Sequence, residues 1–156
     1  MGRRSSHTIA VMNGAMELAR QVGAVPVRRT PDGNLLVLLV TTLQTQRWVI
    51  PKGWPWPGER DHASAAAEAR EEAGVLGETR PGSIGSYTYE KRRSSGPLPV
   101  RVMVYLLDVR EELDTWPECE RRQRAWFTPS AAAAAVEEPE LRQLLLRLDA
   151  DPAGAL

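Results

Sequence analysis

The sequence contains one cysteine and lacks any hydrophobic run long enough to cross a membrane. Cys119 has no second cysteine with which to form an internal disulfide, which is typical of proteins in a reducing compartment. A membrane helix needs about 20 consecutive apolar residues, and no segment approaches this length. The apolar stretch near the N-terminus is short and interrupted by Asn13 and Gly14, so a secretory signal is a poor interpretation. We therefore expect a cytoplasmic protein with no membrane partner.

The chain also lacks an excess of charge of either sign. Its 20 Lys and Arg residues balance 20 Asp and Glu residues. Binding to nucleic acid through bulk charge therefore has no support, and nucleic acid is not an expected partner. The 156 residues are enough for one domain with a real core, and 42% hydrophobic with 26% charged residues is typical of a soluble globular protein.

Two apolar segments predict the main strands of a sheet. Residues 34–43 form a continuous apolar run, which is typical of a strand covered on both faces. Residues 100–109 alternate, with apolar side chains at 100, 102, 104 and 106 on one face. Residues 51–58 contain three prolines and are expected to be irregular. Shorter strands are predicted at 21–29, 47–51, 83–93 and 124–128.

Three helices complete the expected pattern. The Ala-rich residues 61–73 lie between Asp61, a candidate N-cap, and Gly74, which suits the position just past a helix end. Residues 129–136 suit a short helix, and residues 139–148 carry a leucine stripe that should pack on the sheet. The order of elements predicts an α+β fold, an α/β/α sandwich with a mixed sheet between helices.

We assign residues 21–150 to a single domain and residues 1–20 to an N-terminal arm. The arm is expected to be flexible, and a short helix over residues 12–20 is the alternative. The sequence leaves open whether the chain is a monomer or a homodimer.

Acidic side chains gather on one face of the first predicted helix. Glu68, Glu71 and Glu72 follow the spacing i, i+3, i+4, which places them on one helical face. Like charges at this spacing cost stability unless a cation lies among them. Glu59, in the preceding loop, can fold back towards the same face. Four carboxylates on one loop–helix unit predict a site for a hard cation such as Mg²⁺.

Residues 53–75 resemble the signature of the Nudix hydrolase family. That signature reads Gly, five residues, Glu, seven residues, Arg-Glu, an aliphatic residue, any residue, Glu-Glu, any residue, Gly and an aliphatic residue. The positions that match are Gly53, Glu59, Glu68, Glu71, Glu72, Gly74 and Val75. Seven matches at fixed spacing are far more specific than a lone Gly-rich loop. Ala67 departs from the pattern, because it stands where the family has arginine.

The segments on either side of this signature resemble those of a narrower group. RWVIPKGWPW before the acids and RRQRAWF after them are similar to bacterial relatives of diphosphoinositol polyphosphate and diadenosine polyphosphate hydrolases. The resemblance implies a Nudix fold and a Mg²⁺-dependent pyrophosphohydrolase, with Mn²⁺ as an alternative ion. Its substrate would be a polyphosphorylated small molecule, either a dinucleoside polyphosphate or a diphosphoinositol polyphosphate.

The resemblance also implies roles for the matched acids. Glu68, Glu71 and Glu72 would be catalytic, with Glu71 and Glu72 as metal ligands and Glu68 as a ligand or the general base. Glu59 would be an outer ligand, and the carbonyl of Lys52 or Gly53 would complete the metal shell. A glycine at 53 would also leave room for the backbone to approach the metal.

Ala67 leaves the identity of the general base open. In the family, the arginine at this position orients a catalytic glutamate, whereas Arg70 points about opposite Glu68 because two residues rotate the helix by roughly 200°. Either a residue from another segment holds the base, or a different acid takes its role. The candidates, which the sequence does not rank, are Glu112, Glu118 and Glu120.

Substrate phosphates beyond the metal need cationic partners. Arg holds phosphate oxygens in bidentate fashion, and Lys acts as a point charge. The candidates are Arg47, Lys52, Lys91, Arg122 and Arg124. Trp54 and Trp56 lie in the loop beside the acids, where they either stack on a nucleobase or pack the loop.

Two other functions compete with hydrolysis of a small molecule. A Nudix-fold module that binds a nucleotide without cleaving it would be consistent with Ala67, but it has no need for all four acids. Removal of pyrophosphate from the 5′ end of RNA would use the same chemistry, but the zero net charge argues against it.

Overall fold

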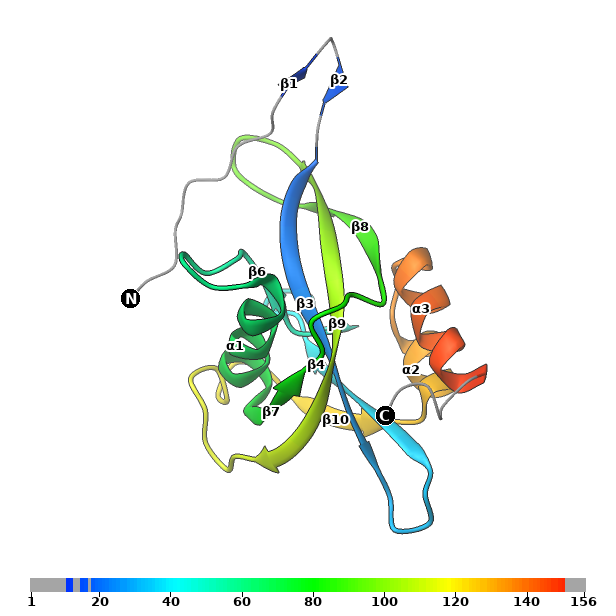
Figure 1. Ribbon diagram of the computed structural model, residues 1–156. Coiled ribbons are helices and arrows are strands. Elements are labelled where there is room, and N and C mark those ends of the chain that lie inside the picture. The colour runs from blue at the N-terminus through cyan, green and yellow to red at the C-terminus, as the bar shows by residue number, and fades with distance from the viewer. Residues whose placement is uncertain (1–10, 13–14, 17, 151–156) are drawn as a thin grey trace.

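The computed structural model describes residues 11–12, 15–16 and 18–150 of the chain (Figure 1). A mixed sheet separates α1 on one face from α2 and α3 on the other (Figure 1). The elements are β1 Val11–Met12, β2 Ala15–Met16, β3 Ala19–Arg29, β4 Leu35–Thr41, β5 Trp48–Val49, β6 Lys52–Gly53, α1 Asp61–Ala73, β7 Val75–Thr79, β8 Gly85–Lys91, β9 Leu98–Glu112, β10 Arg124–Phe127, α2 Pro129–Ala135 and α3 Pro139–Ala150. The predicted α+β sandwich is confirmed.

The main sheet has eight strands among the described residues, in the order β10-β4-β3-β9-β7, with β5 beside β4, β6 beside β3 and β8 beside β9. The long strands β3 and β9 run parallel, whereas the other described pairs of this sheet are antiparallel. Because β6 pairs with β3, it brings Lys52 and Gly53 next to the centre of the sheet. This pairing places the loop that precedes α1.

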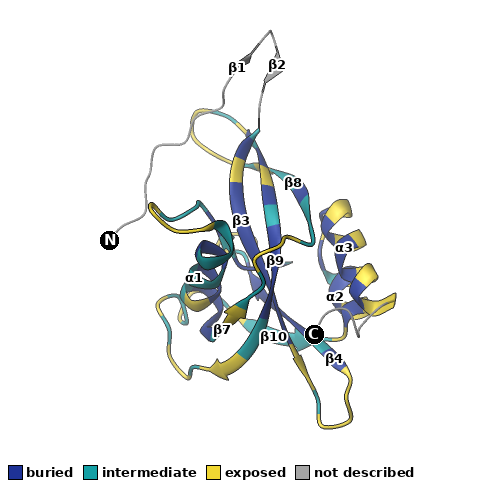
Figure 2. Ribbon diagram, in the orientation of Figure 1, coloured by how far each residue is buried: buried dark blue, intermediate teal, exposed yellow. Residues whose placement is uncertain are grey.

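The apolar residues divide into one core on each face of the sheet (Figure 2). In β4, Val37 and Leu39 face α2 and α3, while Leu38 and Val40 face α1. This strand is therefore covered on both faces, as its continuous apolar run predicts. The alternating face of β9 and the leucine stripe of α3 lie in the core beside α2, as predicted; the buried residues are Val100, Val102, Val104, Leu106, Leu141, Leu144, Leu145 and Leu148.

Alanines form the contact between α1 and the sheet. Ala65, Ala69 and Ala73 are fully buried against strands β3 and β7. Their small side chains let the helix backbone approach the strands closely. Two acids at neighbouring helical positions, Glu68 and Glu72, are therefore buried with them.

Some local predictions were wrong. The N-cap of α1 is Arg60, while Asp61 is the first helical residue and its carboxylate accepts a 2.6 Å ion pair from Arg20. Residues 52–53 form a short strand inside a segment expected to be irregular. Strand β7 was not predicted, because its short VLGET sequence has neither a long apolar run nor a clear alternation.

The first long strand begins two residues earlier than the predicted strand over 21–29. Strand β3 begins at Ala19, so residues 19–20 belong to the main sheet. Strands β1 and β2 pair with each other, which does not agree with a helix over residues 12–20. Residues 1–10, 13–14 and 17 lie outside the described part of the chain. No helix within the described residues is both long and apolar enough to cross a membrane.

Candidate active site

The acids of α1 reach different depths. Glu68 is completely buried and Glu72 is nearly so, whereas Glu71 is half-buried. The helix ends at Gly74, whose φ of 66° lies in the left-handed region and whose N–H donates to the carbonyl of Arg70. The ring of Trp116 covers Gly74, and a side chain at 74 would meet it. The acidic end of the helix is thus closed against a later loop.

Glu72 lies between a backbone donor and a guanidinium. Its Oε1 accepts a 3.2 Å hydrogen bond from the backbone N–H of Lys52, and its Oε2 lies 3.3 Å from Nη2 of Arg122. Burial raises the pKa of Glu72 to about 7, although the positive charges of Arg122 and Lys52 oppose this shift. Without a further cation, the site therefore holds a carboxyl group that titrates near neutral pH.

Arg122 joins this carboxyl to a second acid. Its Nε donates to Glu118 at 2.5 Å, and its Nη1 donates to the carbonyl of Thr41 at 2.9 Å. The backbone N–H of Glu118 also donates to the carbonyl of Glu71. The loop after β9 therefore delivers one acid to the end of α1, and that acid is Glu118.

The other two candidate acids, at the end of β9 and in this loop, do not contact Glu72. Glu112 accepts an ion pair from Arg28 at 2.8 Å, and Glu120 is exposed. Sequence offered one signal for this choice, because Glu118 and Arg122 are spaced i, i+4 in a short turn. That spacing does not by itself show which face of the turn meets α1.

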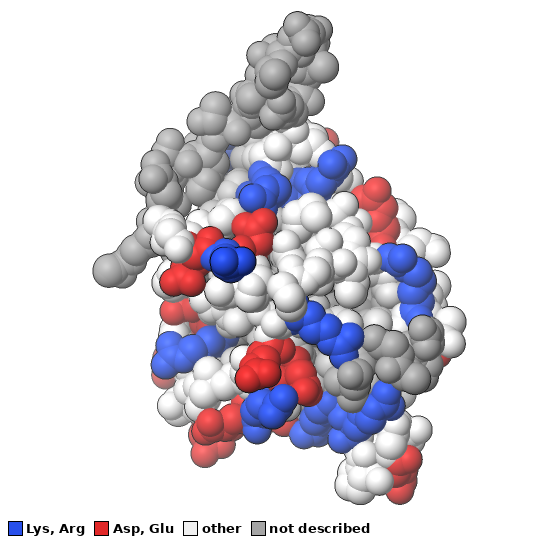
Figure 3. Space-filling model, in the orientation of Figure 1, with Lys and Arg blue, Asp and Glu red and all other residues white. Residues whose placement is uncertain are grey.

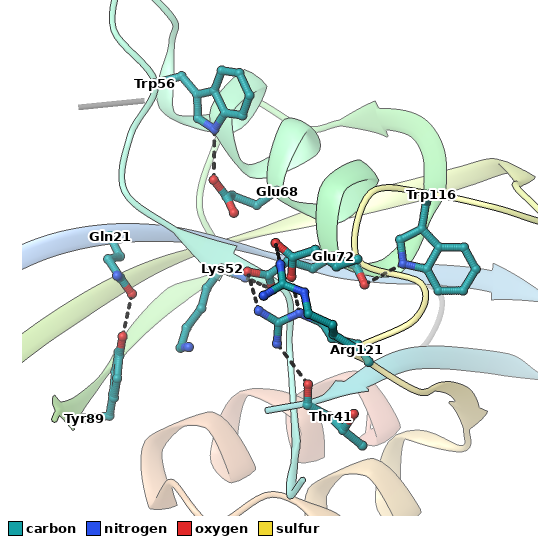
Figure 4. A network of polar contacts seen from close by, with 11 residues as sticks. Gln21, Thr41, Lys52, Trp56, Glu68, Glu72, Tyr89, Trp116 and Arg121 are labelled. Carbon is teal, nitrogen blue, oxygen red and sulfur yellow. Dashed lines mark hydrogen bonds and ion pairs between the residues drawn. The ribbon is translucent and has the colours of Figure 1, made fainter. Parts of the chain in front are cut away.

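Glu68 is held by different residues from those that contact Glu72. Its Oε2 accepts a 2.9 Å hydrogen bond from the indole N–H of Trp56 (Figure 4). A Cβ placed on Gly53 would lie 2.4 Å from the carboxyl carbon of Glu68. The glycine is therefore needed to admit the Glu68 carboxylate, which is a different reason from the metal approach predicted from sequence.

Lys52 extends towards the opposite core. Its Nζ lies 4.6 Å from the centroid of the Tyr89 ring, and the Tyr89 hydroxyl donates to Gln21 at 2.8 Å (Figure 4). Burial lowers the pKa of Lys52, the charge of Glu72 opposes this, and the charge of Lys91 lowers it further. Lys52 and Lys91 are thus close enough for their positive charges to interact.

Arg47 and Arg124 make contacts within the protein. Arg47 lies 2.9 Å from the buried carboxylate of Glu138, an acid that sequence reasoning missed because it precedes α3 without any motif. Arg124 donates to the carbonyls of Ala73, Gly74 and Leu113 and lies 4.0 Å from the centroid of the Trp116 ring. These contacts give Arg124 a structural role, and its predicted role in substrate binding gains no support from them.

The donor set fits a hard cation. The side chains around Glu72 that can ligate are carboxylates, and such oxygen-only sets favour Mg²⁺-type ions. Within the described residues, no group of three or more His, Cys, Asp or Glu side chains is already gathered around one point. Glu59 is exposed, and its backbone N–H donates to the carbonyl of Trp56. A bound cation would therefore draw these acids closer and compete with Arg122 for Glu72.

Known proteins share this fold and sequence. The NUDIX domain family matches residues 17–148. The chain is 31% identical over 137 residues to "Nudix hydrolase 16, mitochondrial" from Arabidopsis thaliana, covering 80% of this chain and 76% of that protein. It is 34% identical over 101 residues to diphosphoinositol polyphosphate phosphohydrolase 2 from Rattus norvegicus, covering 64% of this chain and 52% of that protein. The chain thus spans about half the length of the rat relative.

A solved structure gives the same result for the fold. The crystal structure of a C. elegans Ap4A hydrolase binary complex superposes with a TM-score of 0.64 at 22% identity, over 86% of this chain and 98% of that chain. At this level of identity the similarity concerns the fold.

Proposed function

The chain belongs to the Nudix hydrolase family and is a pyrophosphohydrolase, and we propose that it hydrolyses phosphoanhydride bonds of polyphosphorylated small molecules with the help of Mg²⁺. Dinucleoside polyphosphates and diphosphoinositol polyphosphates are the proposed substrates. Support comes from the flanking segments that resemble hydrolases of these two classes, and from the rat relative, which is named for diphosphoinositol polyphosphates. The observation that carries the proposal is the buried Glu72 carboxyl group beside Arg122 and Lys52.

The cation would be held by acids of α1. Glu71 and Glu72 are the proposed ligands, with Glu68 as a further ligand or the base, and the carbonyl of Lys52 or Gly53 completing the set. Glu59 is proposed as an outer ligand. When bound, Mg²⁺, or Mn²⁺ in its place, would neutralise phosphate oxygens and lower the pKa of a water molecule.

The residues of the chain itself supply binding and orientation. Arg122 fixes Glu72 and Glu118 relative to each other and offers a guanidinium to phosphate oxygens once a cation satisfies Glu72. Lys52 supplies positive charge beside the Tyr89 ring, and the charge of Lys91 acts on Lys52. Glu118 becomes the preferred alternative to Glu68 as general base, because it is the loop acid that lies at this site.

A substrate panel tests the proposal. Purified protein with Mg²⁺ would be incubated with dinucleoside polyphosphates, diphosphoinositol polyphosphates, nucleotide sugars and nucleoside triphosphates, and the products identified by mass. Cleavage restricted to nucleoside triphosphates would overturn the substrate class. Glu72→Gln should abolish turnover, whereas Glu90→Gln, an exposed acid on β8, should not. Near-full activity of Glu72→Gln would overturn the site.

The same panel separates the alternatives. A protein that binds nucleotides without releasing any product would be a binding module. RNA carrying a 5′-triphosphate would be included as a separate substrate, and its cleavage in preference to small molecules would favour the RNA function. Acidic and basic side chains are interspersed on the face in Figure 3, which supports a small-molecule substrate over RNA. We keep the cytoplasm as the proposed location, on the single cysteine.

A further inference from the structure

We propose that Trp56 is a positioning residue for the hydrolytic site, whose indole N–H holds the Glu68 carboxylate in its working orientation. This inference rests on the proposed function for its effect on turnover. The contact that motivates it is the 2.9 Å hydrogen bond from Nε1 of Trp56 to Oε2 of Glu68.

The Glu68 carboxylate is confined from two directions. The Trp56 indole lies against one oxygen, and the backbone of Gly53 lies so close that a Cβ there would stand 2.4 to 2.5 Å from all three carboxyl atoms. The residue is completely buried. A buried carboxylate has few alternative orientations in such a space, so a donor that fixes one oxygen also fixes where the other points.

The backbone of Trp56 is hydrogen-bonded to α1, the helix that carries Glu68. Its backbone N–H donates to the hydroxyl of Ser64 at 2.8 Å, and Ser64 is fully buried on α1 one turn before Glu68. Its carbonyl accepts from the backbone N–H of Glu59 at 3.1 Å. Pro55 and Pro57 flank it and restrict the backbone on both sides. The indole is therefore presented by a stiff turn tied to the same helix.

The residue directly before Glu68 on the helix offers it no side-chain donor. Position 67 carries only the methyl group of alanine, and Arg70 is exposed. A neutral indole N–H orients a carboxylate without placing a positive charge beside it. Trp56 thus belongs to the support of the acid, and a role in stacking on a nucleobase is not needed to explain its place.

Trp56→Phe is the direct test, because it removes the N–H and keeps an aromatic ring. We expect kcat to fall by about 10- to 100-fold with little change in KM, since a displaced catalytic group affects the chemical step more than binding. Trp126→Phe is the matched control, because its indole N–H is buried with no acceptor among the described residues. A Trp56→Phe enzyme with kcat within about twofold of the unmodified enzyme would overturn the inference.

Restoring a donor from the helix separates orientation from packing. In the Trp56→Phe background, Ala67→Arg places a guanidinium one residue before Glu68, and we expect it to recover part of the lost kcat. A purely structural role for Trp56 predicts no recovery, and absence of recovery in a folded double variant would count against the inference.

A spectroscopic measurement is independent of turnover and of the fold of Trp56→Phe. In ¹⁵N-labelled protein the five tryptophans give indole N–H signals, and Trp56 is the one removed by Trp56→Phe. If that variant does not fold, Trp56 is identified by specific labelling. In Glu68→Gln this signal should shift more than the other four, because its acceptor loses its charge; an unmoved signal would overturn the contact.

The two proposals fail in distinguishable ways. If no phosphoanhydride in the panel is cleaved, the proposed function fails, yet the indole shift in Glu68→Gln still decides the Trp56–Glu68 contact. If turnover is present but Trp56→Phe leaves it unchanged, the positioning role fails while the proposed function stands.

Discussion

Nη2 of Arg122 lies 3.3 Å from Oε2 of Glu72, and both side chains are almost completely withdrawn from water. A guanidinium therefore stands where a cation bound to Glu72 would need room. The positive charge of Arg122 offsets part of the cost of burying the Glu72 carboxylate. In the proposed function, a divalent ion bound to Glu72 would compete with Arg122 for this carboxylate.

Arg122→Met should destabilise the metal-free protein. Removing one partner of a buried pair leaves the other charge uncompensated, which typically costs about 3 to 5 kcal/mol. Mg²⁺ should restore more stability to this variant than to the unmodified protein, because it supplies the missing charge. Thermal unfolding with and without Mg²⁺ measures both effects. Arg121→Met is the matched control, because the Arg121 side chain is 61% exposed and its ion pair with Glu118 is long, at 3.7 Å. The stability of this variant should change little.

Stability in the absence of divalent ions should fall as pH rises from 4.5 to about 7. The pKa of Glu72 is raised from 4.5 to about 7 in the folded state, so the folded protein retains this proton longer than the unfolded chain. The contribution of Glu72 is fully present below pH 4.5 and is lost as pH rises through about 7. The expected loss is roughly 3 kcal/mol relative to Glu72→Gln, from chemical denaturation at each pH. A difference between the two proteins that stays constant with pH would contradict this assignment.

Glu118→Gln should lower kcat, whereas Glu120→Gln should not. Glu118 is held by Arg122 beside Glu72, but Glu120 is exposed in the same turn. Loss of a general base typically lowers the rate by about 10²- to 10⁴-fold. Steady-state kinetics on the best substrate of the panel distinguishes the two variants. Equal activity of Glu118→Gln and the unmodified enzyme would leave Glu68 as the acid to consider.

Gly53→Ala should disturb Glu68 directly. The added methyl group would stand 2.4 Å from the carboxyl carbon, so either the strand or the acid must move. We expect a loss of about 1 to 3 kcal/mol in the free energy of unfolding and a loss of turnover. Gly82→Ala is the control, because a Cβ at that position meets no atom of the described chain within 4 Å. A fully active Gly53→Ala enzyme would show that the position of Glu68 is not critical.

Arg124→Met should reduce stability without changing KM. Arg124 donates to two backbone carbonyls at the end of α1 and to that of Leu113 just after β9, and its guanidinium lies over the Trp116 ring. Loss of these contacts should cost about 2 kcal/mol and lower Tm by roughly 5 °C. Arg101→Met, on the exposed face of β9, should leave Tm unchanged. A large rise in KM for Arg124→Met would instead support its originally predicted contact with substrate.

Much of the fold could be predicted from local sequence patterns. The apolar run of β4, the alternation in β9 and the leucine stripe of α3 each depend on neighbours within a few residues, so they could be read directly. The same holds for the spacing of Glu68, Glu71 and Glu72. Strand β7 escaped because its pairing with β9 is a long-range contact that its own residues barely signal.

The parts of the site that sequence did not resolve are those made by distant segments. Glu118 and Glu120 look alike in sequence, and only the packing of their turn against α1 separates them. The sequence predicts stacking or packing for Trp56, because its hydrogen bond to Glu68 spans 12 positions and leaves no local pattern. Arg124 looked like a free cation because the backbone carbonyls that it binds leave no mark on the sequence.

The contacts of Trp116 and Arg124 with the end of α1 form late in the synthesis of the chain. Trp116 donates to the carbonyl of Glu72 across 44 positions, and Arg124 reaches Ala73 across 51. During synthesis, the acidic helix therefore leaves the ribosome well before the residues that close it. The acids stay open to solvent during this interval, and the nascent chain acquires its final site only after strand β10 has emerged.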